Sequence, residues 1–521
     1  MSQIGTNESR IPESGQSHLA SVRSDVEPVL GTGIPGLDDI LGGGLPGERL
    51  YLVEGAPGTG KTTLALQFLL EGRDRGERGL YVTLSETARE LEGVARSHGW
   101  VLDGVTLLDM AAMPDVAAPE AQYTVFHPSE IELHDTVGSV LTRVDEVRPT
   151  RVVLDSLSEM RLLARDPLRF RRQILALKQF FSTRGATVLL LDDQSGNAAD
   201  MQLHSLAHGV VLLEQIALAH GAERRQLRVT KLRGVRFHAG YHDFMIRTGG
   251  LEIFPRIRLG IVPPPPPSGI LSSGSPELDA LLGGGMPYGT SALVTGAPGT
   301  GKSVLSTQYA AAAAERGERV AIYLFDERAG TFLDRAAGLG MHLDAYLRAG
   351  SIVVTALEPT EVSPGEFATR IRRSVTEDGV RLVVVDSLNG FTKAMPEESQ
   401  LTVKIHELLS WLGSRGVTTL LTLAQRGIFG APPDDAADVS YLADAVILLR
   451  YFEAQGAVRR AISVVKQRNA AHESTIRECR IGTGGLGVGE PLRDFHGVLT
   501  GVPTYTGGAG ALMAGNGARR T

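Results

Sequence analysis

The sequence predicts an α/β protein made of two tandem domains, each with a mostly parallel sheet flanked by helices. The string Gly-Ala-Pro-Gly-Thr-Gly-Lys occurs twice, at Gly55–Lys61 and at Gly296–Lys302. Further matches lie at the same spacing, including Gly42–Gly44 with Gly283–Gly285. A single long spacing of this kind indicates two copies of a whole domain rather than a solenoid of short repeats.

Composition along the chain divides it into five parts. Residues 1–28 are polar and are predicted to be disordered. The two domains are predicted at 29–259 and 270–504, and each is long enough for one packed core. Five consecutive prolines, Pro263–Pro267, predict a stiff linker over 260–269. The glycine-rich end, 505–521, is predicted to be a flexible tail.

Short apolar segments around each loop predict the strands of a parallel sheet, with helices between them. Continuous apolar strands are expected where helices cover both faces of such a sheet. In the first copy the predicted strands are Arg49–Val53, Gly79–Leu84 and Arg151–Leu154, with a helix at Thr62–Gly72. In the second copy they are Ala292–Thr295, Val320–Phe325 and Arg381–Val385, with a helix at Ser303–Arg316. A ligand is expected beyond the carboxyl ends of the strands.

Each loop completes the pattern G-x-x-x-x-G-K-[ST], which binds nucleotide phosphates. Backbone N–H groups wrap the phosphates, the lysine reaches the β and γ oxygens, and the hydroxyl faces Mg²⁺. The sequence therefore predicts two sites for ATP and Mg²⁺. The nucleotide-binding residues are predicted to be Gly55, Gly58, Thr59, Gly60, Lys61, Thr62 and Thr63, and Gly296, Gly299, Thr300, Gly301, Lys302 and Ser303.

An aspartate ends the third predicted strand of each copy. Asp155 follows Arg-Val-Val-Leu, and Asp386 follows Arg-Leu-Val-Val-Val. A carboxylate there can hold the cation opposite the loop hydroxyl, so the predicted metal ligands are Thr62 with Asp155 and Ser303 with Asp386. An aspartate after a strand is otherwise usually a turn residue or a helix cap.

Hydrolysis also needs a group that orients and deprotonates water. The candidates end the second predicted strand of each copy, at Ser85-Glu86 and at Asp326-Glu327. Neighbouring strand residues face opposite ways, so at most one member of each pair aims at the γ-phosphate. The candidate catalytic residues are therefore Glu86, Asp326 and Glu327, against the alternative of a solvated acidic turn.

Two basic pairs recur at strand ends. Lys231 and Arg233 are two residues apart, as are Lys466 and Arg468, so each pair lies on one face of a strand. Such a pair could act on a phosphate bound by a neighbouring subunit, as an arginine finger does. The alternative is an ordinary solvated strand end.

Composition predicts a soluble cytoplasmic protein. The 521 residues are 42% hydrophobic and carry a net charge of −7, which gives no overall attraction to nucleic acid or anionic lipid. The single cysteine, Cys479, excludes an internal disulfide. No membrane association is expected, because no apolar run is long enough to span a bilayer and no signal pattern is present.

These residues resemble the KaiC-like ATPases of the cyanobacterial circadian clock, within the RecA superfamily. The duplicated loops carry the resemblance, together with VTLSET, YLFDER, Lys-Leu-Arg-Gly at 231–234 and AVILLRYFEAQGAVRRAISVVKQR. It implies two RecA-like domains, a hexamer of two stacked rings and ATP bound between subunits with Mg²⁺. It also implies ATPase activity in both rings, serine/threonine autokinase activity in the second, and an unidentified regulatory protein partner.

The chain departs from the family pattern at two places. The clock proteins have Glu-Glu at the acidic pair, whereas the first copy has Ser85 before Glu86. Their phosphorylated Ser-Thr pair corresponds to Ser440-Tyr441, and Asp435 takes the place of another family threonine. Ser440 is thus the one candidate phosphosite, and a fixed negative charge lies nearby.

Two other functions remain open on the sequence. Five arginines between Arg161 and Arg172 could belong to a DNA-handling RecA-like protein. However, Asp166-Pro167 predicts the start of an amphipathic helix whose arginines form a solvated face, so nucleic acid is not the expected partner. The second alternative is a scaffold in which ATP holds a ring together with little turnover.

Overall fold

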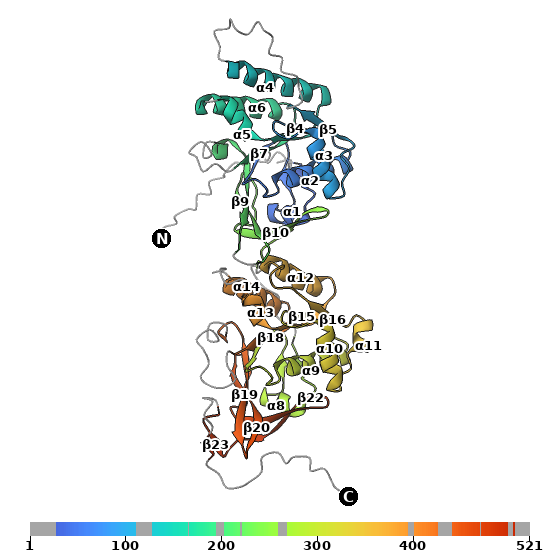
Figure 1. Ribbon diagram of the computed structural model, residues 1–521, viewed down its shortest axis with the longest axis vertical. Helices are drawn as coiled ribbons and strands as arrows, with labels where there is room; N and C mark the ends of the chain where they lie inside the picture. The colour runs from blue at the N-terminus through green and yellow to red at the C-terminus, as the bar shows by residue number, and fades with distance from the viewer. Residues whose placement is uncertain are drawn as a thin grey trace, which may run out of the picture.

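The computed structural model forms two lobes stacked along the long axis of the molecule (Figure 1). It describes residues 28–110, 128–164, 166–193, 203–218, 221–258, 268–393, 401–425, 440–468, 470–498 and 504–505. The predicted N-terminal segment before residue 28, the proline run and the tail after residue 505 lie outside these described residues. Each lobe contains one nine-stranded sheet, which confirms the predicted α/β class.

The first lobe has the sheet order β11-β10-β9-β8-β3-β7-β6-β4-β5. The six strands from β8 to β5 run parallel, and β9, β10 and β11 continue the sheet antiparallel. Its strands are β1 (Val29–Leu30), β2 (Leu45–Pro46), β3 (Leu50–Gly55), β4 (Gly79–Thr83), β5 (Val105–Asp109), β6 (Arg151–Asp155), β7 (Thr187–Asp193), β8 (Gly209–Ile216), β9 (Arg224–Leu232), β10 (Tyr241–Arg247) and β11 (Gly250–Phe254). Its helices are α1 (Pro35–Leu41), α2 (Lys61–Asp74), α3 (Ala88–Ser97), α4 (Pro128–Val147), α5 (Leu157–Ala164) and α6 (Pro167–Ser182).

The second lobe repeats this topology with the order β16-β15-β17-β18-β14-β19-β20-β21-β22. Its strands are β12 (Ile270–Leu271), β13 (Met286–Pro287), β14 (Ser291–Gly296), β15 (Arg319–Leu324), β16 (Ile352–Ala356), β17 (Val380–Asp386), β18 (Thr418–Ala424), β19 (Ala445–Ala454), β20 (Ala457–Gln467), β21 (Arg477–Gly482), β22 (Gly485–Pro491), β23 (Phe495–His496) and β24 (Thr504–Tyr505). Its helices are α8 (Pro276–Leu281), α9 (Lys302–Glu315), α10 (Ala329–Gly338), α11 (Asp344–Arg348), α12 (Pro364–Thr376), α13 (Leu388–Lys393) and α14 (Leu401–Ser414).

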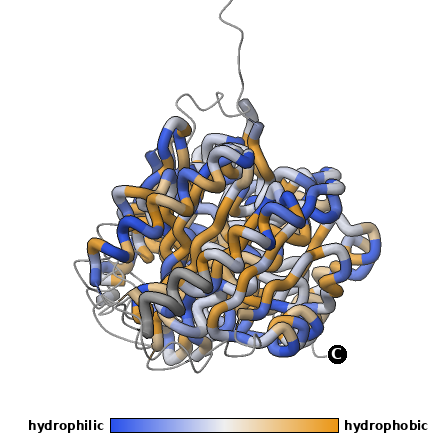
Figure 2. Tube along the Cα trace, turned by 90° about the horizontal axis from the view of Figure 1, so that it is seen from above, coloured by the Kyte–Doolittle hydropathy of each residue, from blue (hydrophilic) through white to orange (hydrophobic). Residues whose placement is uncertain are grey.

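The central strands are apolar on both faces because helices cover both sides of each sheet. Every residue of β3, β4 and β6 is buried. Seen along the long axis, apolar strands fill the middle of the molecule and polar residues lie mainly at its rim (Figure 2). The predicted strands and loop helices match the observed ones to within two residues at each end. The continuous apolar runs therefore predicted buried parallel strands correctly.

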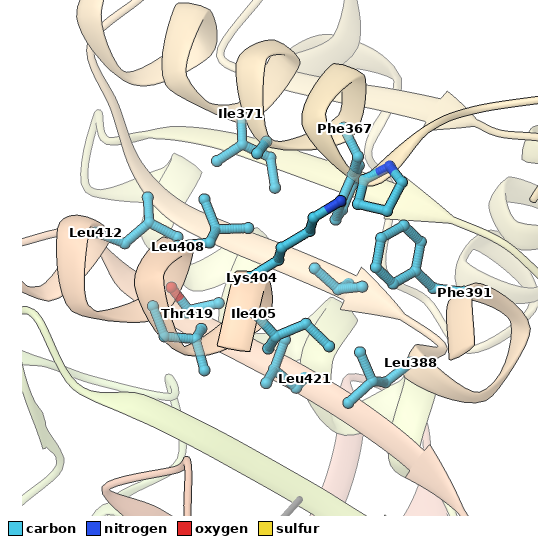
Figure 3. A pocket seen from close by; sticks show the side chains of 14 residues that line it. Phe367, Ile371, Leu388, Phe391, Lys404, Ile405, Leu408, Leu412, Thr419 and Leu421 are labelled. Carbon is cyan, nitrogen blue, oxygen red and sulfur yellow. The ribbon is translucent and has the colours of Figure 1, made fainter. Parts of the chain in front are cut away.

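An apolar cavity lies between α12, α13, α14 and the sheet of the second lobe (Figure 3). Phe367 and Ile371 reach it from α12, Phe391 from α13, and Leu408 from α14, while the Lys404 side chain crosses one side. Its volume of about 20 Å³ would hold one water molecule at most. The cavity is therefore a packing feature of the core and too small for an organic ligand.

Polar side chains join the two lobes beneath β10. Asp243 is buried and accepts a hydrogen bond from the Gly365 N–H at 2.7 Å, at the N-terminus of α12. It also lies 3.5 Å from Lys404. Arg247 pairs at 2.6 Å with Glu366, whose side chain is 2% exposed. The second lobe thus takes part of the cap of α12 from the first lobe.

Replacing Asp243 with alanine should lower the free energy of unfolding by about 1–2 kcal/mol, because the Gly365 N–H loses its acceptor. Chemical denaturation of the full chain measures the loss, and amide hydrogen exchange at the start of α12 should speed up. Asp39→Ala is the matched control at the same junction. Asp39 is half-exposed and 3.9 Å from Arg372, so its loss should change stability by less than about 0.5 kcal/mol. Equal effects from the two variants would contradict the capping role.

Candidate functional site

Both phosphate loops join a central strand to the helix that follows it, as predicted. Gly60 and Gly301 are the N-cap residues just before α2 and α9, with φ values of 102° and 113°, a left-handed conformation that glycine adopts without strain. Thr59 and Thr300 are fully buried, and each hydroxyl donates to a loop carbonyl at 2.8 Å. The loop shape is therefore stabilised by residues of the seven-residue string that both copies share.

The loop lysines are mostly buried and bind the carbonyl oxygens at the start of their own loops. Lys61 Nζ donates to Gly55 O at 2.7 Å, and Lys302 Nζ donates to Gly296 O at 3.0 Å. Burial lowers the pKa of Lys302, and the Asp386 carboxylate opposes that shift. Thr63, also predicted to bind nucleotide, is buried with its hydroxyl 3.5 Å from His98 Nε2.

Asp155 lies beside its loop hydroxyl, Thr62, and each strand-end aspartate has a hydroxyl partner that the sequence did not reveal. Asp155 Oδ2 accepts from the Tyr81 hydroxyl at 2.5 Å and from Thr62 Oγ1 at 3.4 Å. Asp386 Oδ1 accepts from Thr422 Oγ1 at 2.5 Å. The partner comes from β4 in the first lobe and from β18 in the second. Burial raises the pKa of Asp155, while its bonds to Tyr81 and Thr62 and the charge of Lys61 lower it.

The residues present fit a magnesium ion at both loops. Asp386 Oδ2 is buried and has no hydrogen-bond partner within the described part of the chain, and such an atom suits a ligand to a hydrated cation. In the first lobe the hydroxyl of Thr62 and the carboxylate of Asp155 face each other directly. The described residues contain no group of three or more His, Cys, Asp or Glu side chains that could hold a metal by itself. The fit is therefore to Mg²⁺ bound with nucleotide phosphates, which needs only one or two protein ligands.

The acidic pairs differ between the lobes in more than residue type. In the second lobe Asp326 accepts a hydrogen bond from Ser387, the residue after Asp386. Glu327 turns instead to α10, where Arg335 holds it with two bonds of 2.7 Å. Asp326 is therefore the member of the pair that lies beside the strand-end aspartate.

In the first lobe Ser85 is exposed, and Glu86 lies near the site. Glu86 Oε2 is buried without a hydrogen-bond partner among the described residues. Burial, together with the Asp155 and Glu90 carboxylates, raises the pKa of Glu86, and Lys61 opposes that shift. Glu86 thus lies within electrostatic range of the loop lysine, Lys61, and of the strand-end aspartate, Asp155.

The basic pairs lie at the opposite end of the sheet from the loops of their own chain. The Arg233 N–H donates to the His208 carbonyl, and the His208 N–H donates to the carbonyl of Leu50, at the start of β3. The phosphate loop follows the other end of β3. The Arg468 N–H likewise bonds Asp444, which bonds Ser291 at the start of β14. The length of a strand, roughly 17 Å, separates each arginine from its own loop.

The side chains of each basic pair bond the same kind of partner in both lobes. Lys231 donates to the carbonyls of His204 and Ala207, and Lys466 donates to those of Ser440 and Ala443. Ser440, the candidate phosphosite, therefore occupies the place of His204 and lies next to Lys466. Asp435 falls in 426–439, outside the described residues.

The helix predicted to start at Asp166-Pro167 is present as α6, whereas Arg161 lies in the preceding helix, α5. Asp166 caps α6 by accepting from the Leu168 and Arg169 N–H groups at 2.7 and 3.0 Å. Pro167 is its first residue, and the buried face consists of Phe170, Ile174, Leu177 and Phe181. Arg161 does not face solvent freely, because it pairs with Asp192. This geometry gives the DNA-handling alternative no support.

Sequence reasoning also missed Asp193, at the end of β7. Its carboxylate lies 2.8 Å from Lys61 Nζ, since β7 runs beside β3 with Asp193 level with Gly55. The sequence carried a signal in the adjacent Asp192-Asp193 at the end of an apolar run. The strand order needed to place it beside the loop was not readable from that signal.

Two nucleotide-binding loops, each with a strand-end aspartate on a mostly parallel sheet, define a tandem P-loop ATPase. A comparison with family models matches the KaiC ATPase description over residues 30–258 and 271–493. The chain therefore belongs to the KaiC ATPase family, as the sequence resemblance predicted. None of the described helices is long and apolar enough to cross a membrane.

Similar proteins cover nearly the whole chain. The circadian clock protein KaiC3 of Synechocystis is 29% identical, over 92% of this chain and 95% of its own length. The circadian clock oscillator protein KaiC of Synechococcus elongatus is 28% identical, over 95% of this chain and 94% of its own. The KaiC of Thermostichus vulcanus is 27% identical, over 95% of both.

Tyr81→Phe should lower phosphate release by the first domain about tenfold or more, because Asp155 loses the hydroxyl that orients it. The assay uses a Lys302→Ala chain, in which only the first loop keeps its lysine. Tyr309→Phe, which removes a hydroxyl from the core of the second domain, is the control and should leave this rate unchanged. An unchanged rate in the Tyr81 variant would show that the hydroxyl has no part in orienting Asp155.

Proposed function

We propose that this protein hydrolyses ATP as a two-tiered ring, with nucleotide bound at the interface between subunits and with Mg²⁺. The observation that best supports binding between subunits is the position of the basic pairs. Arg233 and Arg468 lie a strand length away from the loops of their own chain, so their charges suit a phosphate bound by a neighbour. A closed ring gives every loop such a neighbour, and the family resemblance favours a hexamer.

Within each site the chain supplies three kinds of group. The backbone of the loop and its lysine bind the phosphates, and Thr62 with Asp155, or Ser303 with Asp386, would hold the cation. Mg²⁺ supplies positive charge that offsets the charge developing on the transferred phosphoryl group. Lys231, Arg233, Lys466 and Arg468 would stabilise the same charge from the next subunit.

Water activation falls unequally on the two domains. In the second, Asp326 accepts a hydrogen bond from Ser387, the residue after Asp386, and this position supports Asp326 as the carboxylate that takes the proton of the attacking water. Glu327 is bound to Arg335 of α10 and is the second acid of the pair. In the first, only Glu86 remains of the pair. The second domain should therefore carry most of the turnover, and the first should contribute mainly binding and assembly.

Ser440 is the proposed target of autokinase activity. Lys466 bonds its carbonyl oxygen, so the serine lies beside the cations that would face a neighbour's nucleotide. Transfer would break the bond between the γ-phosphorus and the bridging oxygen of ATP, join that phosphorus to the serine oxygen, and release ADP and the hydroxyl proton. A ring of this kind, acting in cytoplasmic signalling or regulation with a protein partner, agrees with the clock functions named for its relatives.

Mixing two inactive variants tests the ring interface. Arg468→Ala removes the trans-acting charge but keeps the loop, and Lys302→Ala does the reverse. In mixed rings some interfaces combine an intact loop with an intact arginine, so second-domain phosphate release should recover to about a quarter of the wild-type rate. Each variant alone is the control. No recovery on mixing, with rings of normal size, would refute action between subunits.

Asp326→Asn combined with Glu327→Gln should lower total phosphate release about tenfold or more, to the level sustained by the first domain. Glu86→Gln is the matched change in the first domain and should cost much less. Both rates are measured at saturating Mg·ATP, with oligomer size checked by light scattering. Turnover that survives the double change would show that these acids do not activate the water.

A further inference from the structure

The first nucleotide loop contains an ion pair that engages its lysine completely. Lys61 Nζ donates to Gly55 O at 2.7 Å, to Ala56 O at 3.1 Å and to Asp193 Oδ1 at 2.8 Å. An ammonium group has three N–H donors. All three donors are therefore engaged, one of them by the Asp193 carboxylate.

The second loop lacks this pair. Lys302 Nζ donates to Gly296 O at 3.0 Å and to Ala297 O at 2.9 Å, and no carboxylate of the described residues bonds it. The strand register explains the difference. Asp193 is level with Gly55, and the residue level with Gly296 is Ala424. At the position where the first domain has a carboxylate, the second has a methyl group.

The Asp193 carboxylate is held at the loop by its neighbours. The Ser158 hydroxyl shares its single proton between Asp192 Oδ1 at 3.0 Å and Asp193 Oδ2 at 3.3 Å, and its oxygen accepts from the Asp193 N–H at 3.3 Å. Asp192 is itself 1% exposed and pairs with Arg161. Asp193 is 44% exposed and Lys61 only 9%, so the carboxylate lies at the mouth of the site with the lysine behind it.

We propose that Asp193 sets the nucleotide affinity of the first site by competing with nucleotide phosphate for Lys61. This inference rests on the proposed function, in which both loops bind nucleotide. A loop lysine binds the β and γ oxygens, so Lys61 must give up Asp193 to do so. The released carboxylate then lies next to the polyphosphate, where like charges repel.

Both effects oppose binding at the first site, and neither operates at the second. Because the pair is partly exposed to water, the expected penalty is modest, about three- to tenfold in the dissociation constant. It should be larger for a nucleoside triphosphate than for a diphosphate, since the γ-phosphate brings more negative charge to the lysine. Asp193 thus makes the two loops unequal, although their loop strings are identical.

The test measures binding of Mg²⁺ with AMP-PNP, a non-hydrolysable ATP analogue, and with ADP to full-length chains that carry Lys302→Ala. In this background Asp193→Asn should tighten AMP-PNP binding about three- to tenfold and ADP binding less. The converse change is made in the otherwise unaltered chain. Ala424→Asp should weaken the tighter class of sites by a similar factor, while Ala424→Asn, of nearly the same size, should not.

The outcomes distinguish failure of the Asp193 competition from failure of the proposed nucleotide binding. If chains with both loops intact bind neither nucleotide, the proposed function fails. If the Lys302→Ala chain binds nucleotide but Asp193→Asn leaves both affinities unchanged, this inference fails. If that variant keeps its affinity and loses phosphate release, Asp193 acts in the reaction itself and the competition is refuted. The Ala424 pair gives an independent result if Asp193→Asn does not fold.

Discussion

The site depends on the parallel register of four neighbouring strands. Hydrogen bonds place Gly55 of β3 level with Asp193 of β7, Leu191 of β7 level with Asp155 of β6, and Asp155 level with Thr83 of β4. Parallel strands end at one edge of a sheet, so residues far apart in the sequence meet there. The helices on both faces bury the strands and hold this register. A slip of one residue would turn every side chain of a strand to the other face and separate the loop from its carboxylates.

Much of this arrangement could be predicted from the sequence. The duplicated loops, the apolar runs before Asp155 and Asp386 and the cap at Asp166 are local patterns with one physical meaning each. They gave the fold, the element bounds to within two residues, and the family. The roles of Glu86, Asp326 and the basic pairs remain predictions, although the structure shows where those residues lie.

The missed residues have one reason in common. Tyr81, Thr422 and Asp193 reach the site only because their strands are neighbours in a particular order and level. No spacing along the chain encodes that order. Tyr81 and Thr422 also come from different strands in the two lobes, so comparison of the repeats could not reveal them. The position equivalent to Asp193 in the second domain is Ala424. Without the strand register, this difference between the repeats has no evident meaning.

The two domains share the same backbone contacts but differ in which carboxylates they carry around the site. Lys231 and Lys466 bond carbonyl oxygens in the same pattern, and the loop lysines bond the same carbonyls of their own loops. Around that shared frame the first domain has Glu86 and Asp193, and the second has Asp326 and Glu327. Contacts that shape the backbone tolerate little change, whereas side chains at the open edge of the sheet can change without disturbing the core.

The contact between Asp243 and the start of α12 bears on how such a duplicated chain can evolve. A domain that borrows a cap from its neighbour is no longer a self-sufficient module, because separating the two would leave Gly365 without its acceptor and Glu366 without Arg247. The tandem order has in this way become part of the fold of the second domain. Exchanging, reversing or deleting one copy would carry a structural cost that two copies joined only by a linker would not have.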